Sequence, residues 1–171
     1  MKKINLSAGT FLAIISFSIA GSVIYELPYI RNVYYDKFVE AFGMTNAQVG
    51  FLMSAYAVGC LLLYIPGGIL ADKFSTKKML VLSLMGTGAL GIVMALSMNY
   101  VTALIAFFLF AVTTSFVFWA ALNKGLRIIG GKEDSGSTYG WYYALGSVIS
   151  LVCGLGFWAL YTSTENSHDA M

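Results

Sequence analysis

The sequence predicts an all-α integral membrane protein built from about five transmembrane helices. Hydrophobic residues make up 58% of the 171-residue chain, whereas charged residues make up only 11%. An ordinary soluble domain carries about 25% charged residues, so a water-soluble fold of this size would leave much apolar surface exposed. A bilayer removes the need to bury that surface, and in lipid an α-helix satisfies its own backbone hydrogen bonds.

Five apolar stretches are long enough to cross a hydrocarbon core of about 30 Å, which takes about 20 helical residues. We place these spans at about residues 6–30, 47–71, 78–98, 101–124 and 138–161, with a polar carboxyl-terminal tail over residues 162–171. Small residues recur four positions apart within several spans, for example at Gly146, Ser150 and Gly154. This spacing permits close contact between helix backbones in lipid, so we expect the spans to form one bundle.

The basic residues of the loops predict the orientation of the chain. With the amino terminus in the cytoplasm, only Arg31 and Lys37 fall outside. The eight on the cytoplasmic side are Lys2, Lys3, Lys73, Lys77, Lys78, Lys124, Arg127 and Lys132. This positive-inside bias predicts a multi-pass protein of the cell membrane with a cytoplasmic amino terminus and an outside carboxyl terminus.

The first 25 residues leave a second interpretation open, a cleaved secretory signal. Lys2 and Lys3 would form its charged start, and Ser18-Ile19-Ala20 would form its cleavage site. The apolar run continues through Val23-Ile24-Tyr25, which favours a retained span.

The most specific pattern joins the second and third spans. It reads Pro66-Gly67-Gly68-Ile69-Leu70-Ala71-Asp72-Lys73-Phe74-Ser75-Thr76-Lys77-Lys78. This segment resembles the signature loop of the major facilitator superfamily, G-x-L-a-D-r-x-G-r-k, which also lies between the second and third helices. The matching positions are Gly68, Leu70, Ala71, Asp72, Lys73 and Lys77. Ser75 and Thr76 stand where the family usually has Gly and Arg, which removes one cation.

A second element, Arg127-Ile128-Ile129-Gly130-Gly131, is similar to the R-x-x-q-G element of that family, with Gly130 in place of Gln. The resemblance implies that Arg127 pairs with Asp72 and helps to hold a closed cytoplasmic face. An ordinary cytoplasmic anchor is the alternative for Arg127. The helix-5 antiporter element of the family, glycines around a proline, is absent from this chain.

Polar side chains within the spans are the candidates for contact with a solute or a proton. Tyr25 and Tyr29 share a stripe of the first span with Ser18, Ser22 and Asn32, at steps of three and four residues. Glu26 and Arg31 lie near the outer end of that span, and an acid within a span is a functional candidate. On the fourth span, Trp119 and Asn123 follow Ser115 at four-residue steps.

No catalytic constellation, metal-ligand spacing or phosphate-binding glycine loop is visible, so we expect neither an enzyme nor a cofactor or metal. The partners that we expect are the lipid bilayer and a small-molecule solute, with no nucleic acid.

The family resemblance implies twelve helices in two six-helix halves with the solute between them. This chain would then supply an incomplete first half, and we expect it not to transport alone but to need the remainder of the transporter. The missing antiporter element and the polar stripe favour uptake of a small polar or anionic nutrient. The alternative is a small multispan membrane protein with a scaffolding or regulatory role.

Overall fold

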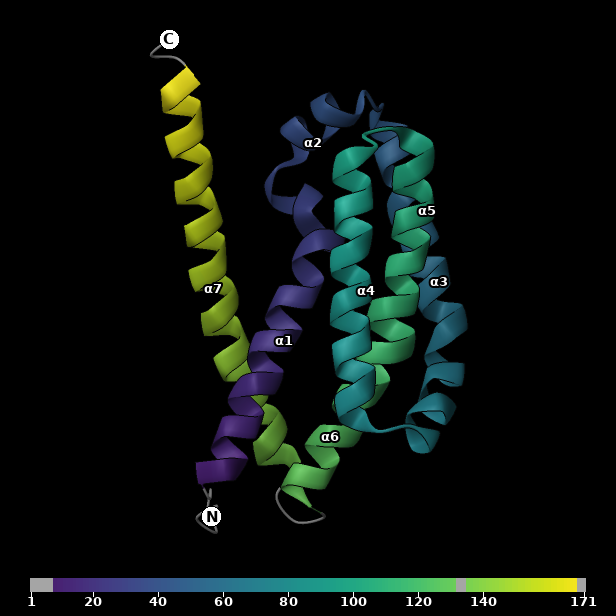
Figure 1. Cartoon of the computed structure of the whole chain (residues 1–171), viewed down its shortest axis with the longest axis vertical. Helices are drawn as coiled ribbons and strands as arrows, with labels where there is room; N and C mark the ends of the chain where they lie inside the picture. The colour runs from purple at the N-terminus through teal and green to yellow at the C-terminus, as the bar shows by residue number, and fades with distance from the viewer. Residues whose placement is uncertain (1–7, 132–134, 169–171) are drawn as a thin grey trace.

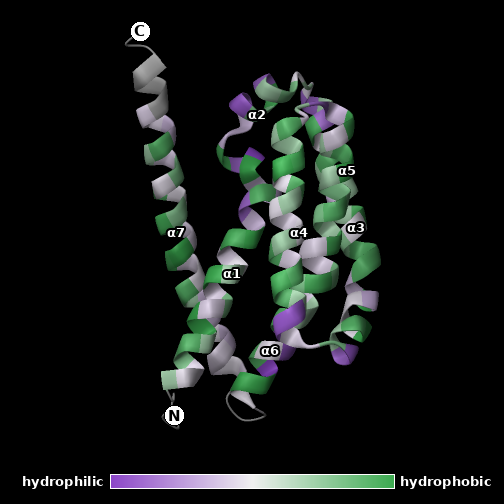
Figure 2. Cartoon of the chain, in the orientation of Figure 1, coloured by the Kyte–Doolittle hydropathy of each residue, from purple (hydrophilic) through white to green (hydrophobic). Residues whose placement is uncertain are grey.

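The computed structural model describes residues 8–131 and 135–168 of the chain, and this part is a bundle of helices (Figure 1). Within these two ranges, five helices are long and apolar enough to cross a membrane, which confirms the predicted fold class. They are Ala8–Val33, Asn46–Lys73, Thr76–Leu96, Tyr100–Gly130 and Ser135–Ser163. Hydrophobic residues cover the length of the bundle, and hydrophilic residues gather towards its two ends (Figure 2).

The fourth span is divided by a π-helix, and a short helix joins the first two spans. In chain order the elements are α1 (Ala8–Val33), α2 (Tyr35–Phe42), α3 (Asn46–Lys73), α4 (Thr76–Leu96), α5 (Tyr100–Ala111), η1 (Val112–Trp119), α6 (Ala120–Gly130) and α7 (Ser135–His168). Helix α7 runs beyond the predicted fifth span into the segment expected to be a polar tail. We call the end of the bundle that carries α2 and residues 97–99 the α2 end, and the opposite end the α6 end.

At the α2 end, side chains cap the first turns of two spanning helices, α3 and α5. Thr45 and Gln48 form a capping box at the start of α3, with the Gln48 Oε1 atom 2.8 Å from the Thr45 backbone N. The Asn99 Oδ1 atom accepts a hydrogen bond of 2.9 Å from the Thr102 backbone N at the start of α5. Each cap satisfies a donor that has no partner inside its own helix.

The fourth span lies at the centre of the bundle, where it packs against α3 and α4. In its most apolar window 44% of the residues are buried, against none in the fifth span. One buried cluster, which includes Leu52, Phe107 and Phe110, lies towards the α2 end. A second, which includes Phe118 and Leu126, lies towards the α6 end. The fourth span is therefore the central helix against which α3 and α4 pack.

Helix α7 is held against α1 by two serine hydroxyls and leans away from the bundle towards its carboxyl end (Figure 1). The Ser18 Oγ atom lies 3.0 Å from the Tyr142 backbone oxygen, and the Ser22 Oγ atom lies 2.9 Å from the Gly146 backbone oxygen. Both hydroxyls also lie within hydrogen-bond distance of a carbonyl on their own helix. Ser18 and Ser22 thus join two helices, although their spacing predicted a stripe facing a solute.

Candidate functional site

One face of the bundle carries a large depression walled by α1, α3 and η1, with a volume of about 920 Å³. Aromatic side chains dominate this central cavity, and none of its lining residues is acidic, basic or histidine. The lining residues are Tyr25, Tyr29, Met53, Tyr56, Ala57, Cys60, Leu61, Tyr64, Ile65, Ser115 and Trp119. The first and fourth spans therefore meet at their predicted aromatic residues, and α3 adds a third wall.

The central cavity shares lining residues with two further depressions. Tyr64 and Trp119 also line a depression of about 550 Å³ at the α6 end, together with Asp72, Asn123 and Arg127. Tyr25 and Tyr29 also line a depression of about 490 Å³ between α1 and α7. Its polar lining residues are Ser22, Tyr25, Glu26, Tyr29, Asn32, Tyr142, Tyr143, Ser147 and Ser150. We call these three neighbouring depressions together the lateral channel.

Contacts between rings fix the aromatic side chains of the central cavity. The Tyr25 ring meets the buried Phe118 ring edge to face, with centroids 6.2 Å apart. The Tyr29 ring meets the Tyr56 ring edge to face at 6.0 Å, and the Trp119 Nε1 atom donates a 3.3 Å hydrogen bond to the Tyr64 hydroxyl. Edge-to-face pairs are favourable ring geometries, so these contacts hold the cavity wall in one arrangement.

The π-helix η1 brings Ser115 and Trp119 to the cavity. Its Thr114 hydroxyl lies 2.6 Å from the Phe110 backbone oxygen and 3.0 Å from the Tyr56 hydroxyl. Both Tyr56 and Thr114 are buried, so this contact ties η1 to α3 inside the bundle. The Asn123 Nδ2 atom donates a 2.8 Å hydrogen bond to the Trp119 backbone oxygen just beyond η1. π-Helical turns within α-helices are rare and often mark functional sites.

Two neighbouring glycines near the end of α3 have opposite surroundings. A methyl group added at Gly67 would lie 2.7 Å from the Phe116 backbone oxygen, so α3 approaches η1 closely at this position. A methyl group added at Gly68 would meet nothing within 4 Å. Gly68 lines the α6-end depression, so its surface faces the lateral channel and makes no close contact within the described helices.

The Lys124 ammonium group binds the carboxyl end of α3. Its Nζ atom donates hydrogen bonds of 2.7 Å to the Ala71 backbone oxygen and 3.2 Å to the Phe74 backbone oxygen. A cation at this position satisfies carbonyls that have no partner within the helix, and it opposes the negative end of the helix dipole. The family resemblance had directed attention to Arg127, three residues further along α6.

Asp72 and Arg127 both line the α6-end depression, but no ion pair joins them among the residues that the structure describes. Both side chains are exposed. Lys73 and Lys77 are also exposed at this end, and Leu70 packs against the buried cluster near Phe118. Ala71, the next residue of the pattern, is buried in the same cluster. The segment that carries the family pattern thus combines two residues packed inside with charged residues facing outwards.

Of the residues predicted to contact a solute or a proton, Tyr25, Glu26, Tyr29, Trp119 and Asn123 all line the lateral channel.

Arg31, also predicted to contact the solute, lies outside the lateral channel, and its Nε atom is buried without a hydrogen-bond partner among the described residues. Sequence reasoning missed the α3 wall at Tyr56, Cys60 and Tyr64. Their spacing, with Tyr56, Cys60 and Tyr64 at four-residue steps, was the available signal.

A channel lined by aromatic rings and hydroxyl groups can bind a small molecule, and it runs along the spanning helices. Among the described residues, no group of three or more His, Cys, Asp or Glu side chains could hold a metal ion. The fold and this channel define a multi-pass helical membrane protein with a cavity on one face of its bundle.

The chain belongs to the Major Facilitator Superfamily, whose sequence pattern matches residues 6–165. This confirms the predicted resemblance, and the family is made up of transporters rather than enzymes.

Three proteins of Escherichia coli (strain K12) are similar to this chain. The inner membrane protein YqcE is 35% identical over 137 residues, which are 80% of this chain and 32% of YqcE. The inner membrane protein YihN is 27% identical over 145 residues, which are 85% of this chain and 34% of YihN. The L-fucose-proton symporter is 30% identical over 133 residues, which are 73% of this chain and 30% of the symporter.

The chain spans about a third of the length of these curated relatives. No solved structure gives a significant match.

Proposed function

We propose that this chain forms one wall of the solute pathway in a secondary carrier that moves a small polar solute across the membrane. The shared walls of the three depressions are the observation that carries this proposal. The depressions share Tyr64 and Trp119 on one side of the central cavity, and Tyr25 and Tyr29 on the other. A line of polar and aromatic groups along the spans suits a solute that passes the apolar part of the bilayer.

Glu26 is our candidate for contact with a proton. Its side chain is partly exposed, and it lines the depression between α1 and α7 beside Tyr25 and Tyr29. An ionisable group inside a span is costly unless it has a function, which supports this assignment. The relative named as a proton symporter supports coupling to protons. A Glu26→Gln variant, which keeps the shape of the side chain but cannot ionise, would then lose uptake driven by a pH gradient.

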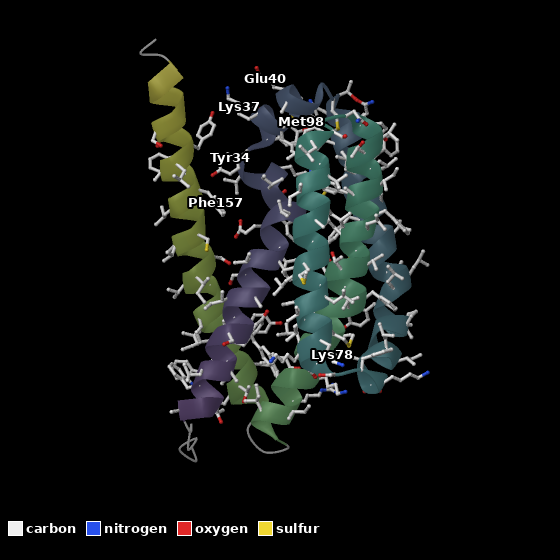
Figure 3. The ribbon with its side chains drawn as sticks, viewed as in Figure 1. Tyr34, Lys37, Glu40, Lys78, Met98 and Phe157 are labelled. Carbon is white, nitrogen blue, oxygen red and sulfur yellow. The ribbon has the colours of Figure 1, made fainter. Side chains whose placement is uncertain are left out.

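We propose that a second wall comes from further membrane helices, supplied by the rest of a longer transporter. On α3, the side chains of Leu61 and Ile65 are 77% and 76% exposed, although both line the central cavity. A second, mostly apolar groove of about 300 Å³ lies between α1, α4 and α7, where Tyr34 and Phe157 both form its wall (Figure 3). Relatives about three times longer supply a source for the covering helices, and without them we expect no transport.

We propose that the α6 end faces the cytoplasm. Among the described residues, five cations lie at that end, namely Lys73, Lys77, Lys78, Lys124 and Arg127, against Arg31 and Lys37 towards the α2 end. Figure 3 shows Lys78 at one end of the bundle and Lys37 at the other. The positive-inside rule then supports a cytoplasmic amino terminus and an outside carboxyl terminus.

The signature segment would close the pathway at the cytoplasmic end. Asp72 and Arg127 face the same depression without pairing within the described helices, and the surface of Gly68 is open beside them. We propose that these three residues meet the second wall when that end closes. The Lys124 contact with Ala71 and Phe74 would keep the segment in position during the movement.

Cysteine accessibility in the membrane tests the proposed pathway. In a background with Cys60→Ala and Cys153→Ala, single cysteines would replace Tyr29, Trp119 and Asn123, and a membrane-impermeant charged thiol reagent would be added from either side. We expect all three positions to react, because a solute pathway is open to water. The matched controls are cysteines at Leu82 and Ile92 of α4, whose side chains are 65% and 63% exposed on the outside of the bundle. These two thiols would face lipid, where a thiol does not ionise and a charged reagent does not enter, so we expect them to react slowly.

Equal modification rates at the channel and α4 positions would refute the pathway.

Cysteines at Lys37 and Lys77 test the orientation, because reagent outside intact cells should modify only the cysteine at position 37. Reconstitution of the purified chain in liposomes tests the need for a second wall, and saturable uptake by the chain alone would contradict it. A stable folded monomer with an unreactive lateral channel would instead favour the scaffolding alternative.

A further inference from the structure

The central cavity has the wrong chemistry for an ionised solute. Its lining contains no acidic, basic or histidine side chain, so a charged molecule there would have no counter-charge. Removing an unpaired charge from water into an apolar site is very costly. The neighbouring charged groups lie in the flanking depressions, Glu26 on one side and Asp72, Lys124 and Arg127 on the other. This wall therefore offers no counter-charge to a phosphate, a carboxylate or an amine.

The same cavity offers hydroxyl groups for hydrogen bonds. The hydroxyls of Tyr25, Tyr29 and Ser115 have no hydrogen-bond partner among the described residues, whereas the Tyr56 hydroxyl contacts Thr114. Each free hydroxyl can both donate and accept one hydrogen bond with a solute. A purely apolar solute would cover these groups and leave them unpaired, at a cost in affinity.

The cavity also offers ring faces in fixed positions. Phe118 meets the Tyr25 ring, Tyr56 meets the Tyr29 ring, and the Trp119 indole is tied to the Tyr64 hydroxyl. The apolar C–H face of a saturated ring can lie flat on such a surface, while substituents at its edge reach the hydroxyl groups. Because the rings are already fixed in position, little side-chain freedom is lost on binding.

We propose that the central cavity binds an uncharged, hydroxyl-bearing ring compound of the neutral monosaccharide class. This assignment rests on the proposed function and names the solute of the same cavity. The faces of Tyr25, Tyr29 and Trp119 cover the ring, and the hydroxyls of Tyr25, Tyr29 and Ser115 bind its hydroxyl groups. The sequence favoured a small polar or anionic nutrient, and this proposal restricts the class of solutes to uncharged compounds.

The native Cys60 reports on occupation of this cavity, because it is a free thiol that lines it. In a Cys153→Ala variant of the full chain, reconstituted in lipid, Cys60 becomes the one thiol, and its rate of modification by a small charged reagent can be measured. The test solutes are D-glucose, D-galactose and L-fucose as neutral sugars, with glucose 6-phosphate, glucuronate and glucosamine as charged compounds of the same ring size.

We expect at least one neutral sugar to slow the modification of Cys60 in a saturable way, and none of its charged counterparts to do so. Tyr25→Phe and Tyr29→Phe should each weaken the protection about fivefold to tenfold, the usual effect of one lost hydrogen bond. Tyr100→Phe is the matched control, because Tyr100 begins α5 and lies outside the cavity. An unchanged rate without sugar shows that each variant keeps the cavity.

Two results would overturn the solute class and leave the pathway standing: protection by a charged compound equal to that of the neutral sugars, or reaction of Cys60 with no protection by any neutral sugar. A Cys60 that does not react at all would count against the pathway itself. The rate without solute therefore tests the proposed function, and the identity of the protecting solute tests this inference.

Discussion

The Lys124 ammonium group lies 2.7 Å from the Ala71 backbone oxygen, and this hydrogen bond joins α6 to the end of α3. Lys124→Met would keep a long side chain but remove the donor. Hydrogen bonds to charged groups contribute about 1.5–3 kcal/mol. Without this hydrogen bond, local opening of the turn costs less free energy. We therefore expect amide hydrogen exchange over residues 70–76 to become about tenfold faster.

Lys78→Met is the matched control for that experiment. Lys78 is an exposed cation in the first turn of α4, with no hydrogen bond or ion pair in the described part of the chain. Equal exchange rates in the two variants would show that removal of any cation at this end has the same effect, and that the Lys124 contact has no special role.

Gly67→Ala should destabilise the bundle, whereas Gly68→Ala should not. The added methyl group at Gly67 would lie 2.7 Å from the Phe116 backbone oxygen and 3.0 Å from its Cα atom, so α3 and η1 would have to separate. Overpacking of this kind typically costs about 1–3 kcal/mol. Unfolding of the two variants in mixed detergent measures the difference, and a similar loss of stability in both would contradict the packing described for Gly67.

The Tyr56–Thr114 contact should make a measurable contribution to stability. Tyr56→Phe and Thr114→Val each remove one hydroxyl of the 3.0 Å pair. Hydrogen bonds between membrane helices average about 0.6 kcal/mol, so we expect a coupling free energy near that value in a double-mutant cycle. Additive effects of the two substitutions on the free energy of unfolding would show that the hydroxyls do not interact.

Ser18→Ala should weaken the association of α1 with α7. The Ser18 hydroxyl is buried between the two helices, and its loss should cost about 0.6 kcal/mol in the free energy of unfolding. Ser16→Ala is the matched control, since Ser16 makes the same bond to its own helix, 2.9 Å to the Leu12 oxygen, but is exposed. A larger effect at Ser16 than at Ser18 would contradict the role of Ser18 between helices.

The five spanning helices were predictable because length and hydropathy alone decide whether a helix can cross a bilayer. The family was predictable because the segment from Gly68 to Lys77 keeps a dense pattern of glycine, acid and base. Tyr25 and Trp119 could be proposed as site residues because they stand among polar residues at helical spacing.

The α3 wall of the cavity could not be predicted in the same way. Helix α3 is apolar on all sides, and apolar side chains suit lipid, a helix interface and a solute cavity equally well. Only the packing of η1 shows which side of α3 is open, because Gly59 and Gly67 face the fourth span while Tyr56 and Tyr64 line the cavity. The π-helix itself also left no periodic signal, since its additional residue interrupts the pattern of the fourth span.

The π-helix η1 has a consequence for tolerance to length changes. A π-helical segment holds one more residue than an α-helix that follows the same path, because its hydrogen bonds join residues five apart instead of four. Deletion of one residue between Val112 and Trp119 can therefore convert η1 to an α-helix while α5 and α6 keep their facing residues. A deletion in the middle of α4 would instead turn every later side chain of that helix by about 100°. The centre of the bundle is thus the place where the length of this chain can vary by one residue with the least disturbance to the ends.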